Sequence, residues 1–232
     1  MVVRKLKQTA LGQGRSYRRK LLDTLMSRHS GSMKGVVVDL AGKQTNHRGS
    51  FRPPTKDVTR RIVVNLDENV APDVVADIRD TGLESGSADC VILAETLQHV
   101  PGPERCVAEA HRLLKPGGIF IGSIPFLYPV HRDPQDLMRL GPDGLKALLS
   151  DFEDVKIYSM GKFFGVIGLM LERKISPVET GTLLGILGVS KMLKAALLVT
   201  SKILTTFDRN PISLNDDKAL FTTGYFFTGI KR

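Results

Sequence analysis

Three aspartates lie at or next to the ends of short apolar runs that are typical of buried strands. They are Asp39, Asp67 and Asp77, and their runs are 35–40, 61–67 and 74–77. In a parallel sheet the carboxyl ends of the strands are where ligands bind, and a carboxylate after the second strand can accept hydrogen bonds from ribose hydroxyls. Any one of these acids alone would be read as a turn or cap residue. Three in register on successive strands predict a nucleoside site.

A second signal places polar groups beside a further strand. Glu95 and His99 follow an apolar run, and an amphipathic helix comes next. Residues 115–118 (Lys-Pro-Gly-Gly) are expected to stop this helix, because proline cannot continue it and glycine supplies the positive φ of the exit turn. The predicted elements are a strand over 88–95, a helix over 103–114 and a strand over 119–124.

Alternating strands and helices predict an α/β fold, with a mostly parallel sheet and helices on both faces. Further helices are expected over 16–29 and 140–149, a sixth strand over 154–159, and a long loop over 41–60. The last strand, over 219–230, is expected to pair antiparallel at or near the sheet edge, after a helical insertion over 161–206.

The charge of the chain is concentrated at its start. The 232 residues have a net charge of +9, and residues 1–35 hold nine Lys or Arg against one acid, Asp23. We therefore treat residues 1–33 as a basic helical arm and residues 34–232 as the body. The arm could contact anionic lipid or nucleic acid, or form a solvated helix that covers one edge of the sheet. The body lacks basic patches interleaved with aromatics, which argues against nucleic acid.

Two further features concern location. Cys90 and Cys106 have no CxxC-type neighbour, so neither a disulfide framework nor a zinc site is expected, and a reducing cytoplasm is favoured. Apolar stretches cover 163–171 and 182–204, but Lys191 and Lys194 argue against a transmembrane span. The insertion is then either a lobe that closes over the active site or an amphipathic surface that rests on a membrane.

The strand-end acids, the run from Glu95 to Val100 and the Lys-Pro-Gly-Gly segment together resemble the class I S-adenosylmethionine-dependent methyltransferases, and most closely their type 11 branch. The resemblance covers residues 34–160 and implies a Rossmann-like sheet with S-adenosyl-L-methionine as cofactor. It implies that the loop after the first strand wraps the methionine part, that the second acid binds ribose, and that the third lies by adenine. The residues implied are Asp39, Ala41, Gly42, Asp67, Asp77, Ile78 and, near the methionine end, Glu95.

The glycine-rich loop departs from this family. The usual pattern is Asp-x-Gly-x-Gly-x-Gly, whereas residues 39–45 read AspLeuAlaGlyLysGlnThr. Only Gly42 remains, with Ala41 and Lys43 at positions where glycine is usual. Since glycine lets the backbone approach a ligand closely, either a variant loop does the same work or the domain has lost its cofactor.

Residues 125–140 resemble the substrate-side loop of sugar- and lipid-linked methyltransferases, in which a His, an Asp and an Arg recur. Here these would be His131, Asp136 and Arg139. A histidine with a pKa near 6.5 can accept a proton from a hydroxyl or amine, so His131 is the candidate general base. The alternative is an ordinary loop histidine, with Arg139 capping the following helix. His99 is expected to pack and hydrogen-bond rather than to catalyse.

These residues predict methyl transfer from S-adenosylmethionine to a small-molecule or glycan- or lipid-linked acceptor, without a metal. The alternative is a catalytically inactive methyltransferase-like module that binds a partner or a membrane surface through residues 1–30 or 163–204. Methylation of nucleic acid is a weaker third option.

Overall fold

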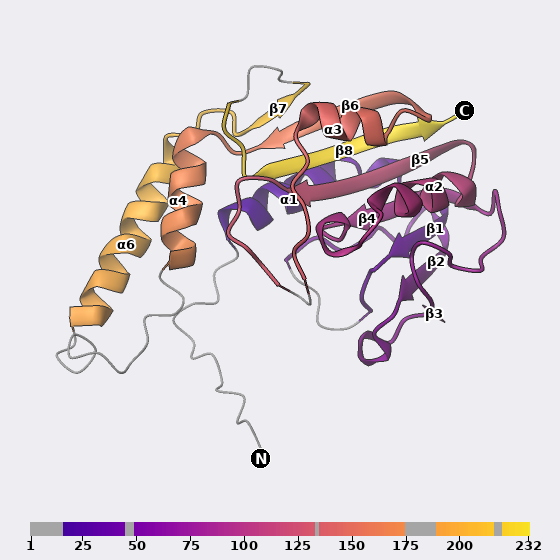
Figure 1. Ribbon diagram of the computed structural model, residues 1–232, viewed down its shortest axis with the longest axis horizontal. Helices are drawn as coiled ribbons and strands as arrows, with labels where there is room; N and C mark the ends of the chain where they lie inside the picture. The colour runs from indigo at the N-terminus through magenta and orange to yellow at the C-terminus, as the bar shows by residue number, and fades with distance from the viewer. Residues whose placement is uncertain (1–15, 45–48, 133–134, 175–188, 216–219) are drawn as a thin grey trace, which may run out of the picture.

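The computed structural model describes residues 16–44, 49–132, 135–174, 189–215 and 220–232. These residues build one eight-stranded sheet in the order β3-β2-β1-β4-β5-β8-β6-β7 (Figure 1). The strands are β1 (Gly35–Leu40), β2 (Val58–Asn65), β3 (Val74–Val75), β4 (Ala88–Ala94), β5 (Leu114–Pro125), β6 (Phe152–Met160), β7 (Ile212–Leu214) and β8 (Gly224–Lys231).

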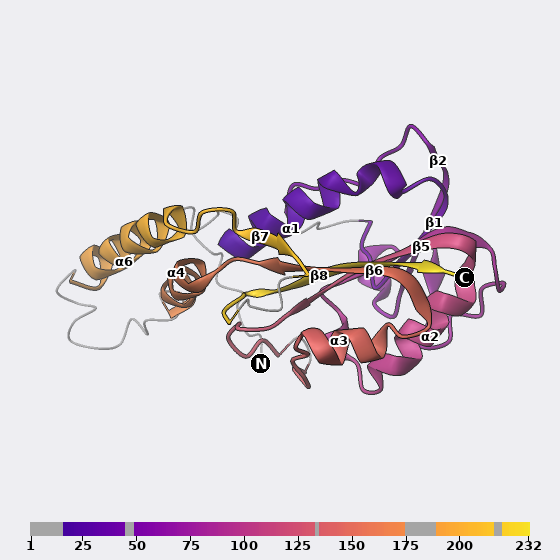
Figure 2. The same cartoon turned by 90° about the horizontal axis from the view of Figure 1, so that it is seen from above.

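Helices cover both faces of the sheet. Figure 2 shows α1 on one face and α2 with α3 on the other, while α4 and α6 lie together at one end. The helices are α1 (Tyr17–Arg28), α2 (Pro103–Leu113), α3 (Pro142–Leu148), α4 (Phe163–Lys174) and α6 (Val189–Thr206), with short 3-10 turns η1 (Ser30–Ser32), η2 (Glu68–Val70) and η3 (Leu97–His99). The predicted α/β fold with helices on both faces is confirmed.

The pairing of the strands confirms a mostly parallel sheet with an antiparallel last strand. β1 pairs in parallel with β2 and β4, β4 pairs in parallel with β5, and β8 runs antiparallel to both β5 and β6. β8 therefore lies inside the sheet, two strands from the edge. This position buries Phe226 and Phe227 completely, one on each face. The edge strand β7 was not predicted, because three residues are too few to show the alternation of apolar and polar side chains that is typical of a strand.

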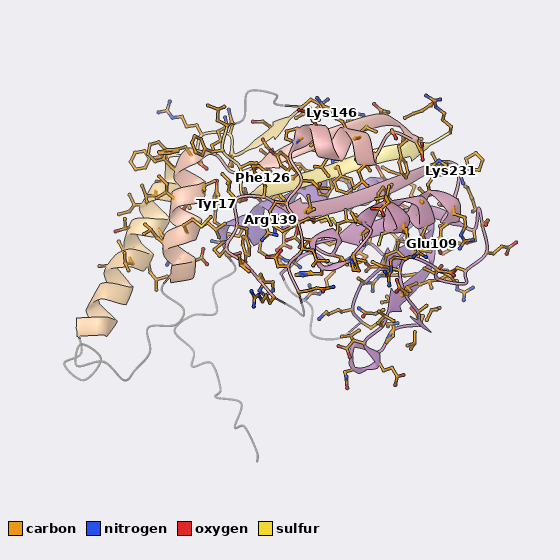
Figure 3. The ribbon with its side chains drawn as sticks, viewed as in Figure 1. Tyr17, Glu109, Phe126, Arg139, Lys146 and Lys231 are labelled. Carbon is orange, nitrogen blue, oxygen red and sulfur yellow. The ribbon has the colours of Figure 1, made fainter. Side chains whose placement is uncertain are left out.

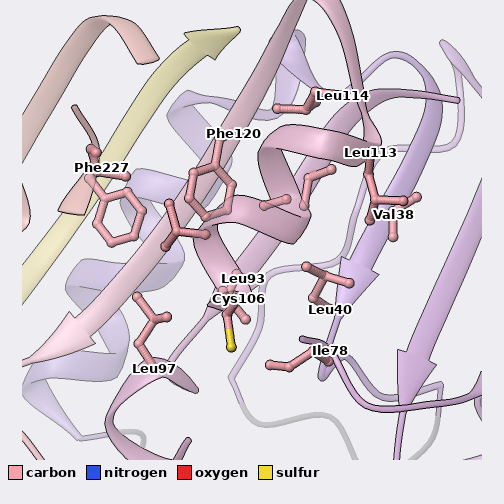
Figure 4. Packing of buried hydrophobic residues seen from close by; sticks show 14 of the residues in the cluster. Val38, Leu40, Ile78, Leu93, Leu97, Cys106, Leu113, Leu114, Phe120 and Phe227 are labelled. Atoms are coloured by element: carbon pink, nitrogen blue, oxygen red, sulfur yellow. The ribbon is translucent and has the colours of Figure 1, made fainter. Parts of the chain in front are cut away.

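The core forms because successive residues of each strand point to opposite faces. In β1, Val38 packs with the α2 side and Val37 with the α1 side. Figure 4 shows the α2 side, where the rings of Phe120 and Phe227 lie 5.6 Å apart near Cys106. On the other face, α1 packs its buried side chains against the sheet, namely Leu21, Leu22, Leu25 and Met26. The predicted basic helix therefore covers a face of the sheet rather than an edge.

Several element ends differ from the predictions. β2 ends at Asn65, so Asp67 follows the strand and begins η2 instead. Residues 115–118 lie within β5, where the pairing shifts from Ala88–Leu114 to Cys90–Ile119. These residues form a bulge, and Gly117 takes the positive φ of 77° that was expected of an exit turn. The helix ends one residue earlier because Leu114 is already extended.

The lobe consists of α4 and α6, which lie side by side in both views (Figures 1 and 2). They pack closely because Gly168 has no side chain: the Ser201 hydroxyl donates to its carbonyl at 2.7 Å. The predicted helix over 182–204 is described from Val189 onward, and residues 182–188 and the side chains of Lys191 and Lys194 lie outside the described residues. Among the helices that are described, none is both long and apolar enough to cross a bilayer.

We expect Phe227→Ala to lower the free energy of unfolding by about 3–5 kcal/mol, because a fully buried ring is lost between two strands and leaves a cavity. Urea denaturation measures this change. Val75→Ala, on the edge strand with 54% of Val75 exposed, is the control and should change stability by about 0.5 kcal/mol or less. Equal losses in the two variants would contradict the central position of β8.

Candidate functional site

A cleft of about 720 Å³ lies at the carboxyl ends of β1, β2 and β4. Its lining draws on α1, the loop after β1, the turn after β2 and the segment after β4. All the residues that the sequence implied for a cofactor line this one cleft, namely Asp39, Ala41, Gly42, Asp67, Asp77, Ile78 and Glu95. The structure therefore brings these residues together, and their role in binding stays a prediction.

The loop after β1 turns back on itself at the two residues that follow the strand. Ala41 has a left-handed φ of 58° and donates its N–H to the Val64 carbonyl at 2.8 Å. Gly42 lies so close to the Asp39 carboxyl that a Cβ on it would collide. The Asn65 amide donates to the Gly42 carbonyl at 2.8 Å and ties the loop to the end of β2. Ala41 thus adopts the conformation for which glycine is usual.

Asp39 is held by the chain itself. The guanidinium of Arg61 on β2 binds its carboxylate, with Nη2 and Oδ2 2.5 Å apart. The pair connects β1 to its neighbour beneath the loop. Asp39 therefore stabilises the turn from inside, and its charge is already balanced before any ligand arrives. Local sequence patterns did not indicate Arg61 as its partner, because the two residues lie 22 positions apart.

Asp67 has an oxygen left for a ligand. It caps η2, and both the Asn69 backbone N–H at 3.0 Å and the Asn69 side-chain amide at 2.7 Å donate to Oδ1. The side-chain and backbone hydrogen bonds from Asn69 hold the pKa of Asp67 below its usual value, so the carboxylate stays ionised at neutral pH. None of the described residues donates a hydrogen bond to Oδ2, so its lone pairs can accept one from a hydroxyl in the cleft.

Asp77 holds an arginine across the rim of the cleft. Arg79 donates to both carboxylate oxygens, from Nε to Oδ1 at 3.0 Å and from Nη2 to Oδ2 at 2.5 Å, and also reaches the Pro101 carbonyl at 3.4 Å. The hydrogen bonds from Arg79 lower the pKa of Asp77. Ile78, between them in sequence, packs against the core and leaves 6% of its surface exposed, and it also lines the cleft. Asp77 therefore positions the Arg79 guanidinium at the rim of the cleft. Sequence patterns did not indicate Arg79.

Glu95 is the most constrained acid of the site. It has a left-handed φ of 60°, and the Ser123 hydroxyl on β5 donates to its Oε1 at 2.7 Å. Both terminal nitrogens of Arg18 bind the same carboxylate, with Nη2 at 2.7 Å from Oε1. Burial raises the pKa of Glu95, but the charge and hydrogen bonds of Arg18 and the Ser123 hydroxyl outweigh burial, so the pKa is lowered.

Arg18 itself is buried, with 4% of its surface exposed. Its Nε donates to the Thr223 carbonyl at 3.1 Å, and its guanidinium lies 5.7 Å from the centre of the Tyr128 ring. Sequence reasoning missed it, because it lies 77 residues before Glu95 on a helix whose other cations are mostly solvated. The only signal was the basic character of the arm.

The predicted acceptor residues form a cluster beside the cleft rather than in its lining. Arg139 pairs with Asp136, with Nη2 2.6 Å from Oδ2, and the His131 backbone N–H donates to the same oxygen at 2.8 Å. Figure 3 shows Arg139 near the loops below Phe126. Arg139 does not cap the next helix, since the cap of α3 is Gly141 without a side-chain bond.

His99 connects this cluster to the cleft. Its ring lines the cleft and lies 5.9 Å from the His131 ring, edge to face. It is hydrogen-bonded to the Gln135 carbonyl, and the Gln135 amide donates back to the His99 carbonyl at 3.0 Å. His99 thus packs and hydrogen-bonds as expected. Among the described residues, no group of histidines, cysteines or acids is arranged to hold a metal ion.

Parts of the chain are similar to known proteins. Residues 55–122 match the methyltransferase domain family. A stretch of 51 residues is 43% identical to an uncharacterised 37.1 kDa protein of a Streptomyces fradiae transposon, which amounts to 22% of this chain and 15% of that protein.

Solved structures share the fold at low identity. Phosphoethanolamine N-methyltransferase 2 of Haemonchus contortus, in complex with phosphomonomethylethanolamine and S-adenosylhomocysteine, is 14% identical with a TM-score of 0.52 over 90% of this chain and 52% of its own. A methyltransferase from Archaeoglobus fulgidus is 15% identical with a TM-score of 0.51 over 92% and 94% of the two chains. The cyclase SpnF is 15% identical with a TM-score of 0.53 over 97% and 84%. The chain thus spans about half of the Haemonchus enzyme and a small part of the transposon protein.

We expect Ala41→Gly to raise the free energy of unfolding by up to about 1 kcal/mol, because glycine adopts a positive φ without the steric cost that alanine bears. Gly42→Ala, at the next position, should lower it by more than about 1 kcal/mol, because its Cβ collides with the Asp39 carboxyl. Thermal or urea unfolding measures both. Destabilisation by Ala41→Gly would show that the loop follows another path.

The Asp136–Arg139 pair predicts a dependence of stability on pH. Hydrogen bonds from Arg139 lower the pKa of Asp136 from 3.8 to about 2, and the Asp136 side chain is 3% exposed. A lowered pKa stabilises the fold above pH 4, and this contribution is lost as the pH falls toward 2. Asp136→Asn should therefore lower the free energy of unfolding at pH 7 by about 2 kcal/mol.

Urea denaturation of the Asp136→Asn variant and the unsubstituted protein at several pH values tests this effect. The difference should shrink toward zero as the pH falls from 4 to 2. Asp143→Asn serves as the control, because Asp143 is fully exposed with Lys146 at 3.9 Å, and its effect should stay below about 0.5 kcal/mol. A difference that is independent of pH would rule out the ion pair as its source.

Proposed function

We propose that this chain, which has the fold of the class I S-adenosylmethionine-dependent methyltransferases and a methyltransferase domain over residues 55–122, binds S-adenosylmethionine in the cleft and transfers its methyl group to a small-molecule acceptor. The observation that carries the proposal is the convergence of the strand-end acids on one cleft, with Asp67 ionised and its Oδ2 available.

The residues of the cleft fit a nucleoside with a charged tail. Its volume of about 720 Å³ lies within the range common for small-molecule sites. The Asp67 carboxylate can accept hydrogen bonds from ribose hydroxyls, and Ile78 offers an apolar surface for a base. The loop at Ala41 and Gly42 brings backbone rather than side chain to the cleft. These features support the assignment of Asp67 to ribose and of Ile78 to adenine.

For methyl transfer, the main task of the chain is to position the acceptor against the methyl donor. S-adenosylmethionine supplies a methyl group that is already activated, so the chain needs no covalent intermediate. What its residues contribute is orientation of the acceptor, and such positioning lowers a barrier substantially. The Arg18–Glu95–Ser123 contacts fix the end of β4, where the donor's methionine part would lie. His131 would accept the proton of an acceptor hydroxyl or amine, and the Asp136–Arg139 pair would hold the loop that carries it.

The acceptor is proposed to be small. The Haemonchus enzyme binds phosphomonomethylethanolamine, a small phosphorylated amine, on the same fold. The resemblance of residues 125–140 to sugar- and lipid-linked methyltransferases extends the proposal to glycan- or lipid-linked acceptors. Such an acceptor would enter from the side of Tyr128 and Arg139.

A second candidate is an inactive module that keeps the fold for binding. The observation in its favour is that three acids of the cleft already have arginine partners within the chain: Asp39 with Arg61, Asp77 with Arg79, and Glu95 with Arg18. The alanine at position 41, where this family usually has glycine, also favours an inactive module. Binding of the donor without methyl transfer to any acceptor would favour this candidate.

Titration calorimetry with S-adenosylhomocysteine tests the proposed site. We expect binding, and a stabilisation of about 2.7 kcal/mol when the ligand is present at a hundred times its Kd. Asp67→Asn should weaken binding by at least about tenfold, because a charged hydrogen-bond acceptor is lost. Asparagine caps a helix as well as aspartate does, so η2 should persist.

Glu68→Gln is the matched control. Glu68 is the next residue, carries the same charge and does not line the cleft. It should bind S-adenosylhomocysteine as tightly as the unsubstituted chain. Absence of heat and of any thermal shift in the unsubstituted protein would overturn the proposal, and equal weakening by the two variants would remove Asp67 from the site.

A further inference from the structure

A patch of touching aromatic rings lies on the surface where the lobe joins the sheet. Phe163 lies against Phe221 at 5.0 Å and against Phe164 at 5.4 Å, and Phe164 lies 5.7 Å from Phe207. Each of these rings is between 41% and 60% exposed, and Leu220 beside Phe221 is 83% exposed. We call these five residues the phenylalanine patch. It holds four of the ten phenylalanines in the chain.

The fold assembles this patch from three separate segments. Phe163 and Phe164 begin α4, Phe207 follows the end of α6, and Phe221 precedes β8. Figure 1 shows the start of α4 and the end of α6 at the same end of the lobe, beside β7. The exposed side chains Val199 and Ile203 extend the apolar surface along α6. Contiguous exposed apolar area of this kind is typical of an interaction surface.

Hydrogen bonds to a buried aspartate hold the patch in shape. Asp208, next to Phe207, accepts the backbone N–H of Lys162 at 2.7 Å and the hydroxyl of Tyr17 at 2.8 Å. The Thr223 backbone N–H donates to the Met160 carbonyl at 2.9 Å, which fixes the approach to β8. The rings are therefore presented by an ordered framework.

Three cations lie close to residues of the patch along the chain. Lys162 precedes Phe163 in sequence, Arg209 lies two residues after Phe207, and Lys202 is exposed on α6. Within the described parts of the chain, none of these three cations forms a salt bridge. Tyr17, at the start of α1, contacts Asp208 and lies beside α4 (Figure 3).

We propose that the phenylalanine patch rests on the surface of a membrane that contains anionic lipid. Insertion of aromatic rings removes apolar area from water, and the three cations are attracted to anionic headgroups. An apolar protein surface would bury the rings but would not attract the cations. A membrane with anionic lipid would bury the rings and attract the cations as well. The protein would lie on the membrane without crossing it.

Adjacent residues of α1 connect this surface to the cleft. Tyr17 binds Asp208 at the patch, and Arg18 binds Glu95 at the end of β4. Contact with lipid would therefore place the cleft near the membrane surface. The proposal concerns where the protein docks, and it stands whether or not the cleft transfers a methyl group.

Co-sedimentation of the full chain with vesicles tests the proposal. We expect binding to vesicles of phosphatidylcholine with phosphatidylserine, and much weaker binding to phosphatidylcholine alone. The double variant Phe164→Ser/Phe207→Ser should bind the anionic vesicles at least about tenfold more weakly. Lys202→Gln and Arg209→Gln should each weaken binding about fivefold. This is the gain in affinity expected from one basic side chain near an anionic membrane surface.

The matched control is Val75→Ser/Leu137→Ser, which replaces two exposed apolar residues away from the patch and should bind as the unsubstituted chain does. Circular dichroism verifies that every variant is folded. Failure of the folded protein to bind anionic vesicles would overturn the proposal, as would equal binding by the phenylalanine variant. Sedimentation velocity without lipid supplies the other outcome: a dimer that Phe164→Ser/Phe207→Ser abolishes would assign the patch to a second copy of the chain.

Discussion

The buried guanidinium of Arg18 holds together parts of the chain that are far apart in sequence. It binds the Glu95 carboxylate after β4 and the Thr223 carbonyl before β8, and it lies against the Tyr128 ring after β5. A buried charge is stable only when it is paired and hydrogen-bonded. Because Arg18 and Tyr17 are neighbours, the same turn of α1 holds both Glu95 in the lining of the cleft and Asp208 at the attachment of the lobe.

Two residues that line the cleft have a strained backbone. Ala41 after β1 and Glu95 after β4 both have a left-handed φ, at 58° and 60°, although neither is glycine. Strained conformations of this kind persist where surrounding contacts over-determine them, and they cluster at functional sites. Here the Val64 carbonyl holds Ala41, and Ser123 with Arg18 holds Glu95. The loop after β1 therefore keeps its turn with alanine, not glycine, at the position of positive φ.

Local patterns predicted the strands and the strand-end acids, because buried β-branched runs and their polar ends are visible within a few residues. The same patterns did not predict the partners of these acids. Arg18, Arg61 and Ser123 meet them only after the sheet has formed, at separations of 77, 22 and 28 residues. Nor could local sequence place β8 inside the sheet, since strand order depends on packing between distant segments. Residues 115–118 were predicted to be a turn because their bulge becomes visible only in the pairing of β5 with β4, which local sequence does not show.

A crystal structure grown with S-adenosylhomocysteine would test the proposed nucleoside site at the strand ends. We expect ribose hydroxyls at hydrogen-bond distance from the Asp67 carboxylate, about 2.5–3.0 Å, with the adenine against Ile78. A nucleoside bound elsewhere, or a cleft that stays empty at saturating ligand, would contradict it.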